Sequence, residues 1–358
     1  MRGTGGEKIY RARGAGFRAD RRTARRPSPR RGKSVNKKRS AEAAAIEHIE
    51  KAFRFPRDRR LLLGPGDDCA VLRHAAGRDL VITTDEMVEG THYLPRFARP
   101  EDIAAKLLRM NLSDLASMGD VKPVSCVAGA GLRRDLPPGF IRRFVSGLRS
   151  EALRFGISVA GGNLAGAREN HFYMTAWGET GRGKPVTRGG ASPGDLLLNI
   201  GPLGEAAAGL EVLKRGIAAQ KKKFAALVRS FWRPEPMLLA GKTIGRRSLA
   251  TAMLDNSDGL QRSAEIISRL SGCRAVLSLG EGACSPELRA WCRFKTRDWR
   301  YYAVGGGEDY GLVFTAGPRR LGEIKKLLPG AVVVGRMEKG GGVRVENYDG
   351  EVRGFEHF

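Results

Sequence analysis

From Ala41 onward, short apolar runs of strand length alternate with longer amphipathic runs of helical spacing, and this alternation limits the possible folds more than any other feature. Leu80–Thr84 has the length of a strand, whereas Ile103–Met118 and Phe140–Phe155 have helical periodicity and are each followed by a glycine. Such alternation is typical of α/β and α+β folds, in which helices cover sheets. No apolar run approaches the roughly 18 residues that would span a bilayer, so we expect no membrane association.

The turn-rich stretch Thr187–Gly194 separates two groups of such elements. Because 358 residues exceed one average domain, we expect an N-terminal domain over residues 41–190 and a C-terminal domain over residues 191–358. The further elements that the pattern predicts are helices at 41–53, 205–214 and 258–270 and strands at 124–130, 157–160, 172–177, 195–200, 250–254, 275–279, 312–315 and 332–334.

Residues 1–40 contain 15 Lys and Arg residues against two acidic residues, and so carry about half of the formal net charge of +25. The segment is rich in Gly, Ser and Pro and almost lacks large apolar residues, so we expect a disordered tail. A nucleic-acid-binding arm, a transit peptide and an over-extended reading frame are alternative interpretations. The glycines and prolines leave no amphipathic stripe for a transit peptide. Since blocks of like charge are usually solvated, nucleic-acid binding is not the expected role.

The cysteines show no paired spacing. There are five of them, without any C-x-x-C pair: Cys69, Cys126, Cys273, Cys284 and Cys292. Disulfide frameworks and zinc sites use closer, paired cysteines. The pattern therefore favours reduced thiols and a cytoplasmic protein.

Four aspartates each lie where an apolar element ends in a turn or opens a helix: Asp67, Asp85, Asp114 and Asp255. Carboxylate oxygens suit Mg²⁺, which usually keeps waters and is shared with substrate phosphates. Alternatively, each Asp is a turn former or a cap, as Asp258 could be for a helix starting at Gly259. Asp114 fits this alternative least, because a carboxylate within an apolar helix is costly without a partner. The coincidence of four motifs indicates a magnesium-bound phosphate site.

Two glycine-rich stretches, Gly161–Asn163 and Gly305–Asp309, could let the backbone approach a phosphate or a metal. Neither is a P-loop or a dinucleotide fingerprint, so a kinase of this sequence would bind ATP through metals. His92 follows Asp85 by seven residues, and both a structural role and substrate contact are open for it.

Seven motifs follow one another in order along the chain: GPGDDCAVL (64–72), TTDEMVEGTHY (83–93), NLSDLASMGD (111–120), TRGGASPGD (187–195), LDNSDGL (254–260), GGGEDYGLVFT (305–315) and GFEHF (354–358). Together they closely resemble the thiamine-monophosphate kinase family, part of the superfamily of aminoimidazole ribonucleotide synthetase. The resemblance extends from about Ala41 to Phe358 and leaves out only the tail.

The resemblance implies a two-domain α/β (α+β) fold. Its N-terminal ATP- and metal-binding sheet domain would form a homodimer through a barrel-like interface, and its C-terminal domain would be an α/β sandwich. The active site would lie between the domains and across the dimer. The implied reaction transfers the γ-phosphoryl group of ATP to thiamine monophosphate and gives thiamine diphosphate and ADP, with several Mg²⁺ ions as cofactors.

The resemblance also assigns roles to individual residues. The implied metal ligands are Asp67, Thr83, Thr84, Asp85, Asp114, Asn163, Asp255 and Asp258. The implied ATP contacts are Gly162, Asn163, Arg188 and Ser257, and the implied thiamine contacts are His92, Glu308 and Phe355. Phe355 replaces an aromatic residue that is often Trp or Tyr, and it keeps a stacking face.

Asn163 departs from the family pattern, since many members carry Asp there. It offers a neutral carbonyl oxygen but no charge, and the following hydroxyls and arginine of the pattern are absent, so activity could be weaker or the substrate changed. No catalytic base is expected, because a phosphate monoester with a second pKa of about 6 is already largely dianionic at neutral pH.

Three alternatives remain open. One is another ATP-using enzyme of the superfamily, although selenophosphate synthetase needs a reactive Cys or selenocysteine in its N-terminal loop, the hydrogenase-maturation relative ends in a cysteine, and the ribonucleotide synthetase lacks the GFEHF ending. Another is a catalytically weakened paralogue or binding protein. The third is a nucleic-acid-binding protein that works through the tail, which would bind DNA in a strongly salt-dependent way.

Overall fold

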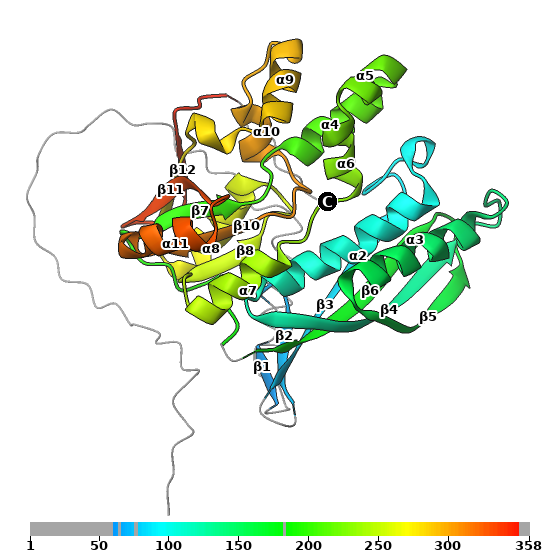
Figure 1. The fold of residues 1–358 in the computed structure, drawn as a ribbon, viewed down its shortest axis with the longest axis horizontal. Coiled ribbons are helices and arrows are strands. Elements are labelled where there is room, and N and C mark those ends of the chain that lie inside the picture. Colours follow the sequence, from blue (N-terminus) through cyan, green and yellow to red (C-terminus); the bar gives the residue numbers. More distant parts are fainter. Residues whose placement is uncertain (1–59, 64–65, 75–77, 182–183, 351–358) are drawn as a thin grey trace, which may run out of the picture. The chain divides into compact units, whose positions relative to one another are not determined.

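The computed structural model describes residues 60–63, 66–74, 78–181 and 184–350 (Figure 1). This part of the chain is a mixed α/β structure, as the alternating pattern predicts, and it contains two six-stranded sheets. The tail predicted over residues 1–40 and the helix predicted at Ala41–Phe53 lie outside the described residues. Among the helices described, none combines the length and the apolar character needed to cross a bilayer.

The first sheet has the strand order β1-β2-β3-β6-β4-β5. Its strands are β1 (Leu61–Leu63), β2 (Ala70–Arg73), β3 (Asp79–Val88), β4 (Val121–Leu132), β5 (Ser158–Gly166) and β6 (His171–Thr180). Neighbouring strands are antiparallel except for β4 and β5, which are parallel. Helix α3 (Phe140–Phe155) connects this pair, because parallel neighbours need a crossover.

The second sheet has the strand order β12-β9-β11-β7-β10-β8. Its strands are β7 (Leu196–Ile200), β8 (Ala252–Asp255), β9 (Arg274–Ser278), β10 (Leu312–Ala316), β11 (Val332–Glu338) and β12 (Val343–Glu346). Only β12 and β9 are parallel neighbours. The domain boundary predicted near residue 190 falls in the connection between the two sheets, and the division into two domains stays a prediction.

Helices cover both sheets. Besides α3 they are α2 (Pro100–Ser117), α4 (Glu205–Arg215), α5 (Ala218–Lys223), α6 (Ala225–Trp232), α7 (Leu238–Arg247), α8 (Leu260–Ser271), α9 (Pro286–Lys295), α10 (Arg300–Gly305) and α11 (Leu321–Leu327). Short 3-10 turns are η2 (Pro95–Phe97), η3 (Glu281–Ala283) and η4 (Pro318–Arg320).

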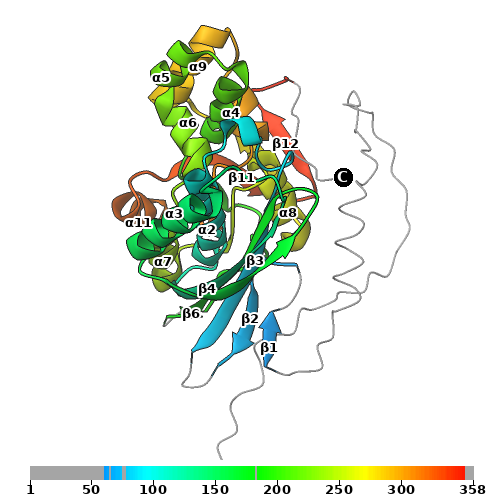
Figure 2. The same cartoon turned by 90° about the vertical axis from the view of Figure 1, so that its right-hand side faces the viewer.

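Helix α2 is buried along almost its whole length, since every residue except Glu101 and Asp114 is buried. It packs on β3 and β6 of the first sheet, on α3, and on α7 and β8 on the side of the second sheet. Figures 1 and 2 show α2 and α3 on one face of the first sheet. Pro100 occupies the first turn of α2, where the missing N–H costs nothing. The helix therefore connects the layers that carry the predicted site residues.

Buried charges on α2 are paired, as their desolvation requires. The Arg109 guanidinium, 2 % exposed, donates from Nε to Glu151 Oε2 at 2.9 Å and from Nη1 to Glu235 Oε2 at 3.0 Å. Asp102 accepts from Arg99 Nε at 2.6 Å and from Arg233 Nη2 at 3.1 Å. These ion pairs tie α2 to α3 and to the segment between α6 and α7.

Every strand and helix that the sequence predicts within the described residues is present, with ends shifted by a few residues. Helix α3 begins and ends at the predicted positions. Strand β3 is longer than predicted and continues to Val88, so Asp85 lies within the strand and not after its end. The prediction missed the short strands β1, β2 and β12 and the helices α5–α7 and α9–α11.

Candidate metal and phosphate site

Strand β3 turns two predicted ligands toward α2. Side chains alternate along a strand, and Thr83 shares the inward face with the buried Val81 and Met87. Asp85 follows Thr83 by two residues and therefore lies on the same face. Thr83 Oγ1 donates a hydrogen bond to Asp114 Oδ2 on α2 at 2.5 Å. The strand and the helix thus bring together residues that are about 30 positions apart in the sequence.

The second sheet contributes Asp255, the last residue of β8. Its carboxylate is buried and accepts a hydrogen bond from Ser113 Oγ on α2 at 2.8 Å. Ser113 is a residue that the sequence did not single out. Its position next to Asp114 in the NLSD motif is the signal that could have indicated it.

The turn before β2 contributes two adjacent aspartates. Asp67 Oδ2 accepts from the backbone N–H of Arg188 at 3.0 Å. Asp68, whose side chain is 1 % exposed, accepts from Ser117 Oγ at 2.7 Å and from Arg188 Nε at 2.9 Å. Arg188, predicted as an ATP contact, therefore lies beside the aspartates.

Three carboxylates converge. Asp68, Asp114 and Asp255 each place an oxygen within 4.8 Å of the others'. The sequence predicted Asp114 and Asp255, and it predicted Asp67, which is the neighbour of Asp68 in the chain. All the donors are oxygens, and a buried group of carboxylates is repulsive without a cation, so the residues present fit a hard divalent ion such as Mg²⁺.

The pKa values of these carboxyl groups reflect the same crowding. Burial, with the charges of Asp258 and Asp68, raises the pKa of Asp85 to about 7. Burial and the neighbouring Asp68 raise the pKa of Asp67 to about 7. Burial also raises the pKa of Asp114 and of Asp255 above the ordinary range, and other aspartates of the group add to both shifts. A bound cation would oppose all four shifts.

Thr84 does not face the cluster. It lies on the opposite face of β3, where its Oγ1 donates to the backbone carbonyl of Met174 at 3.0 Å. Its hydroxyl therefore supports the sheet in this chain.

Gly162 and Asn163 lie on the edge strand β5, away from the aspartates of the same chain. The sheet register runs from Glu86 through Tyr173 and Gly129 to Asn163, three strand spacings or about 14 Å. Asn163 is exposed. A Cβ on Gly162 would lie 1.7 Å from the carbonyl oxygen of Ala128, so close strand packing already requires glycine there.

Ser257 and Glu308 meet where two loops of the second sheet pack together. The Glu308 N–H donates to the Ser257 carbonyl at 2.5 Å, and the Tyr310 N–H donates to the Asn256 carbonyl at 3.1 Å. Since Asp255 and Asp258 belong to the first of these loops, the glycine-rich loop lies beside the aspartates. Asp258 is not the cap of α8, because Gly259 holds that position.

His92 is partly buried in the loop after β3. Its Nδ1 accepts the N–H of Val88 at 2.9 Å, which leaves the proton of a neutral ring on Nε2. Phe355, the remaining predicted thiamine contact, lies outside the described residues.

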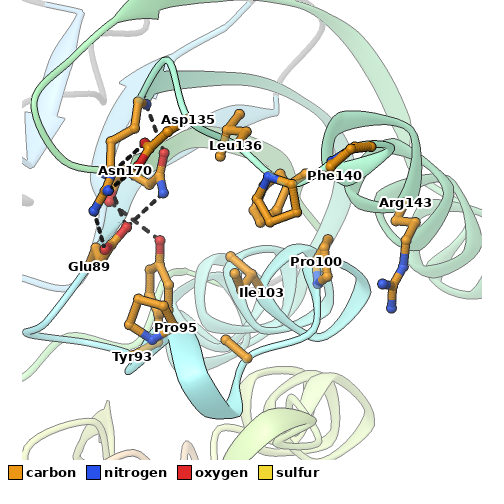
Figure 3. Close-up of a pocket in the computed structure, with 14 residues that line it drawn as sticks. Glu89, Tyr93, Pro95, Pro100, Ile103, Asp135, Leu136, Phe140, Arg143 and Asn170 are labelled. Atoms are coloured by element: carbon orange, nitrogen blue, oxygen red, sulfur yellow. Dashed lines mark hydrogen bonds and ion pairs between the residues drawn. The ribbon is translucent and has the colours of Figure 1, made fainter.

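A cavity of about 340 Å³ lies between the loop after β3, the start of α2 and the loop before α3 (Figure 3). At its polar end Glu89 Oε2 accepts from Asn170 Nδ2 at 2.7 Å, and Arg133 pairs with Asp135. Tyr93, Ile103, Phe140 and several prolines form its apolar walls. Among the described residues, none of the clustered aspartates lines this cavity.

Comparison with known proteins gives consistent matches. Residues 66–180 match the family model described as "AIR synthase related protein, N-terminal domain". The thiamine-monophosphate kinase of Mycobacterium tuberculosis is 33% identical over 76% of this chain and 79% of that protein, and that of Aquifex aeolicus is 31% identical over 82% and 92%. A solved structure of AaThiL complexed with AMPPCP and TMP has a TM-score of 0.78 at 30% identity and covers 88% of this chain and 97% of that one.

The two relatives share more than 30% of their residues with this chain over most of their length, and the solved structure has the same fold. The resemblance inferred from the motifs is thereby confirmed, and the chain belongs to the thiamine-monophosphate kinase family.

Proposed function

We propose that this protein transfers the γ-phosphoryl group of ATP to thiamine monophosphate and releases thiamine diphosphate and ADP. The convergence of Asp68, Asp114 and Asp255 beside Arg188 supports this most, because two anionic substrates need positive charge between them. Family membership supports it as well, and so does the relative that was solved with AMPPCP and TMP. A cytoplasmic location is the expected one for this reaction.

The three converging aspartates would hold Mg²⁺, with Asp67, Thr83, Asp85 and Asp258 around them. When bound, the metal ions would neutralise and align the phosphate groups. The protein itself orients the ligands through Thr83, Ser113 and Ser117, whose hydroxyls each donate to one carboxylate. Arg188 would give up its ion pair with Asp68 and bind a substrate phosphate instead. No general base is needed, because the acceptor is already an anion.

We further propose that the protein acts as a homodimer in which the first sheet faces a second copy. The face of this sheet opposite α2 carries exposed apolar side chains, such as Val127 and Tyr173, each 37 % exposed. Such exposed side chains on one sheet face are typical of interaction sites. Asn163 shares the register of Tyr173, so pairing here would bring β5 to the interface with the partner.

The dimer predicts that a charge on this face separates the subunits. Val127→Glu should shift the mass measured by light scattering from two chains to one. Leu239→Glu, at a side chain of α7 that is 79 % exposed, should leave the mass unchanged. A wild-type monomer, or a Val127→Glu dimer, would contradict the proposal.

The aspartate cluster predicts the activity of single variants. Asp68→Asn and Asp255→Asn should each lower kcat/KM for thiamine diphosphate formation by about a hundredfold or more, because each removes a negative charge that would bind the metal. Asp349→Asn, at an exposed position, should have wild-type activity. The measurement is product formation by chromatography with purified protein, Mg²⁺, ATP and thiamine monophosphate. The proposed function would be overturned if the wild-type protein formed no product. Full activity of Asp68→Asn would show that Asp67, and not Asp68, is the metal ligand from this turn.

The raised pKa values predict how stability depends on pH. The carboxyl groups of Asp67 and Asp85 have a pKa of about 7 in the folded protein and of about 4 when unfolded. The folded state therefore binds more protons between these values, so its stability falls as the pH rises through this range. In EDTA, the Tm should be several degrees lower at about pH 8 than at about pH 6, and the increase on adding Mg²⁺ should be larger at the higher pH. A Tm that rises with pH in EDTA would contradict this account.

A further inference from the structure

Lys106 is a lysine with no exposed surface in the middle of α2. Its Nζ lies 2.7 Å from Glu308 Oε1 and 3.9 Å from the centre of the Phe231 ring. Burial lowers the pKa of Lys106 below its usual value, and the charge and hydrogen bond of Glu308 offset only part of this shift. A lysine placed in this way is costly unless its partner is kept. Because it is inaccessible, its ammonium group can reach a ligand only through Glu308.

Glu308 is held on two sides. Its backbone has a φ of +65° and its N–H bonds to Ser257, in the loop that also carries Asp255 and Asp258. Its side chain remains 26 % exposed. Oε1 accepts a hydrogen bond from Lys106 Nζ, and within the described part of the chain Oε2 has no hydrogen-bond partner. One carboxylate oxygen is thus anchored and the other can receive a ligand.

We infer that Lys106 is a positioning residue that fixes the Glu308 carboxylate for the thiamine part of the acceptor. This inference rests on the proposed function. Thiamine carries a permanent positive charge, which a carboxylate attracts, and an amino group, which can donate a hydrogen bond to a carboxylate oxygen. A carboxylate does not bind the phosphates of ATP, which in the proposed function are held by metal at the aspartates and not by Glu308. Loss of Lys106 should therefore weaken the binding of thiamine monophosphate and leave the binding of ATP unchanged.

The test compares the KM values of both substrates in Lys106→Met, Glu308→Gln and the double variant. Each single variant should raise the KM for thiamine monophosphate by about tenfold or more, as for loss of a hydrogen bond to a charged group, with the KM for ATP within about twofold of wild type. The double variant should be no worse than Glu308→Gln, because Lys106 acts only through Glu308. Additive effects, or an equal rise in both KM values, would overturn the inference.

Two variants keep the test decisive if Lys106→Met does not fold. Lys106→Arg keeps the charge and should retain a KM for thiamine monophosphate within about threefold of wild type, whereas Lys106→Gln should not. Lys295→Met is a matched control, because Lys295 and Glu211 form an ion pair of the same 2.7 Å length between α9 and α4. It should leave both KM values unchanged, and Lys106→Gln behaving like Lys295→Met would overturn the inference.

Binding measurements separate this inference from the proposed function. Calorimetric titration with thiamine monophosphate gives a Kd for wild type and for each variant without turnover. If wild type binds thiamine monophosphate but forms no product, the proposed function fails, and a weaker Kd in Lys106→Gln still supports the role of Lys106. If wild type does not bind thiamine monophosphate, both fail.

Discussion

Helix α2 lies between strands of the first sheet and elements of the second with almost no exposed residue, and most of its charged and hydroxyl side chains bond to residues of other elements. These partners include the residues of the candidate site. Ser117 bonds to Asp68 from the turn before β2, Asp114 accepts from Thr83 on β3, and Ser113 bonds to Asp255 on β8. Satisfying the polar groups of one buried helix therefore gathers carboxylates from both sheets at one place.

This arrangement opposes stability and serves binding. Carboxylates that are desolvated together repel one another, which is why their pKa values rise. The fold tolerates them because packing of α2 and the ion pairs of Arg109 hold the surrounding elements in place. A cation that enters the cluster would remove the repulsion, so metal binding and local stability are expected to be linked. The site is thus preorganised for positive charge before any phosphate arrives.

The sequence predicted most elements and the general chemistry because both depend on local pattern. Helix α3 lies between a proline-rich turn and Gly156, and local signals suffice for such boundaries. Strands β1 and β12 are too short to show alternation. The sequence could not show that Asp68 turns its carboxylate toward Ser117, because this contact spans 49 residues. Likewise, the motif that contains Asn163 could not reveal that β5 lies at the sheet edge, since strand order is a tertiary property.

The central claim is that α2 assembles one metal site from Asp68, Asp114 and Asp255. Anomalous X-ray scattering from crystals of the wild-type protein grown with Mn²⁺ in place of Mg²⁺ tests it most directly, because it locates the metal without relying on activity. The account predicts an anomalous peak in contact with carboxylate oxygens of all three residues. The account would be contradicted if manganese bound only elsewhere, or if the cluster showed no anomalous peak while Asp68 kept its ion pair with Arg188.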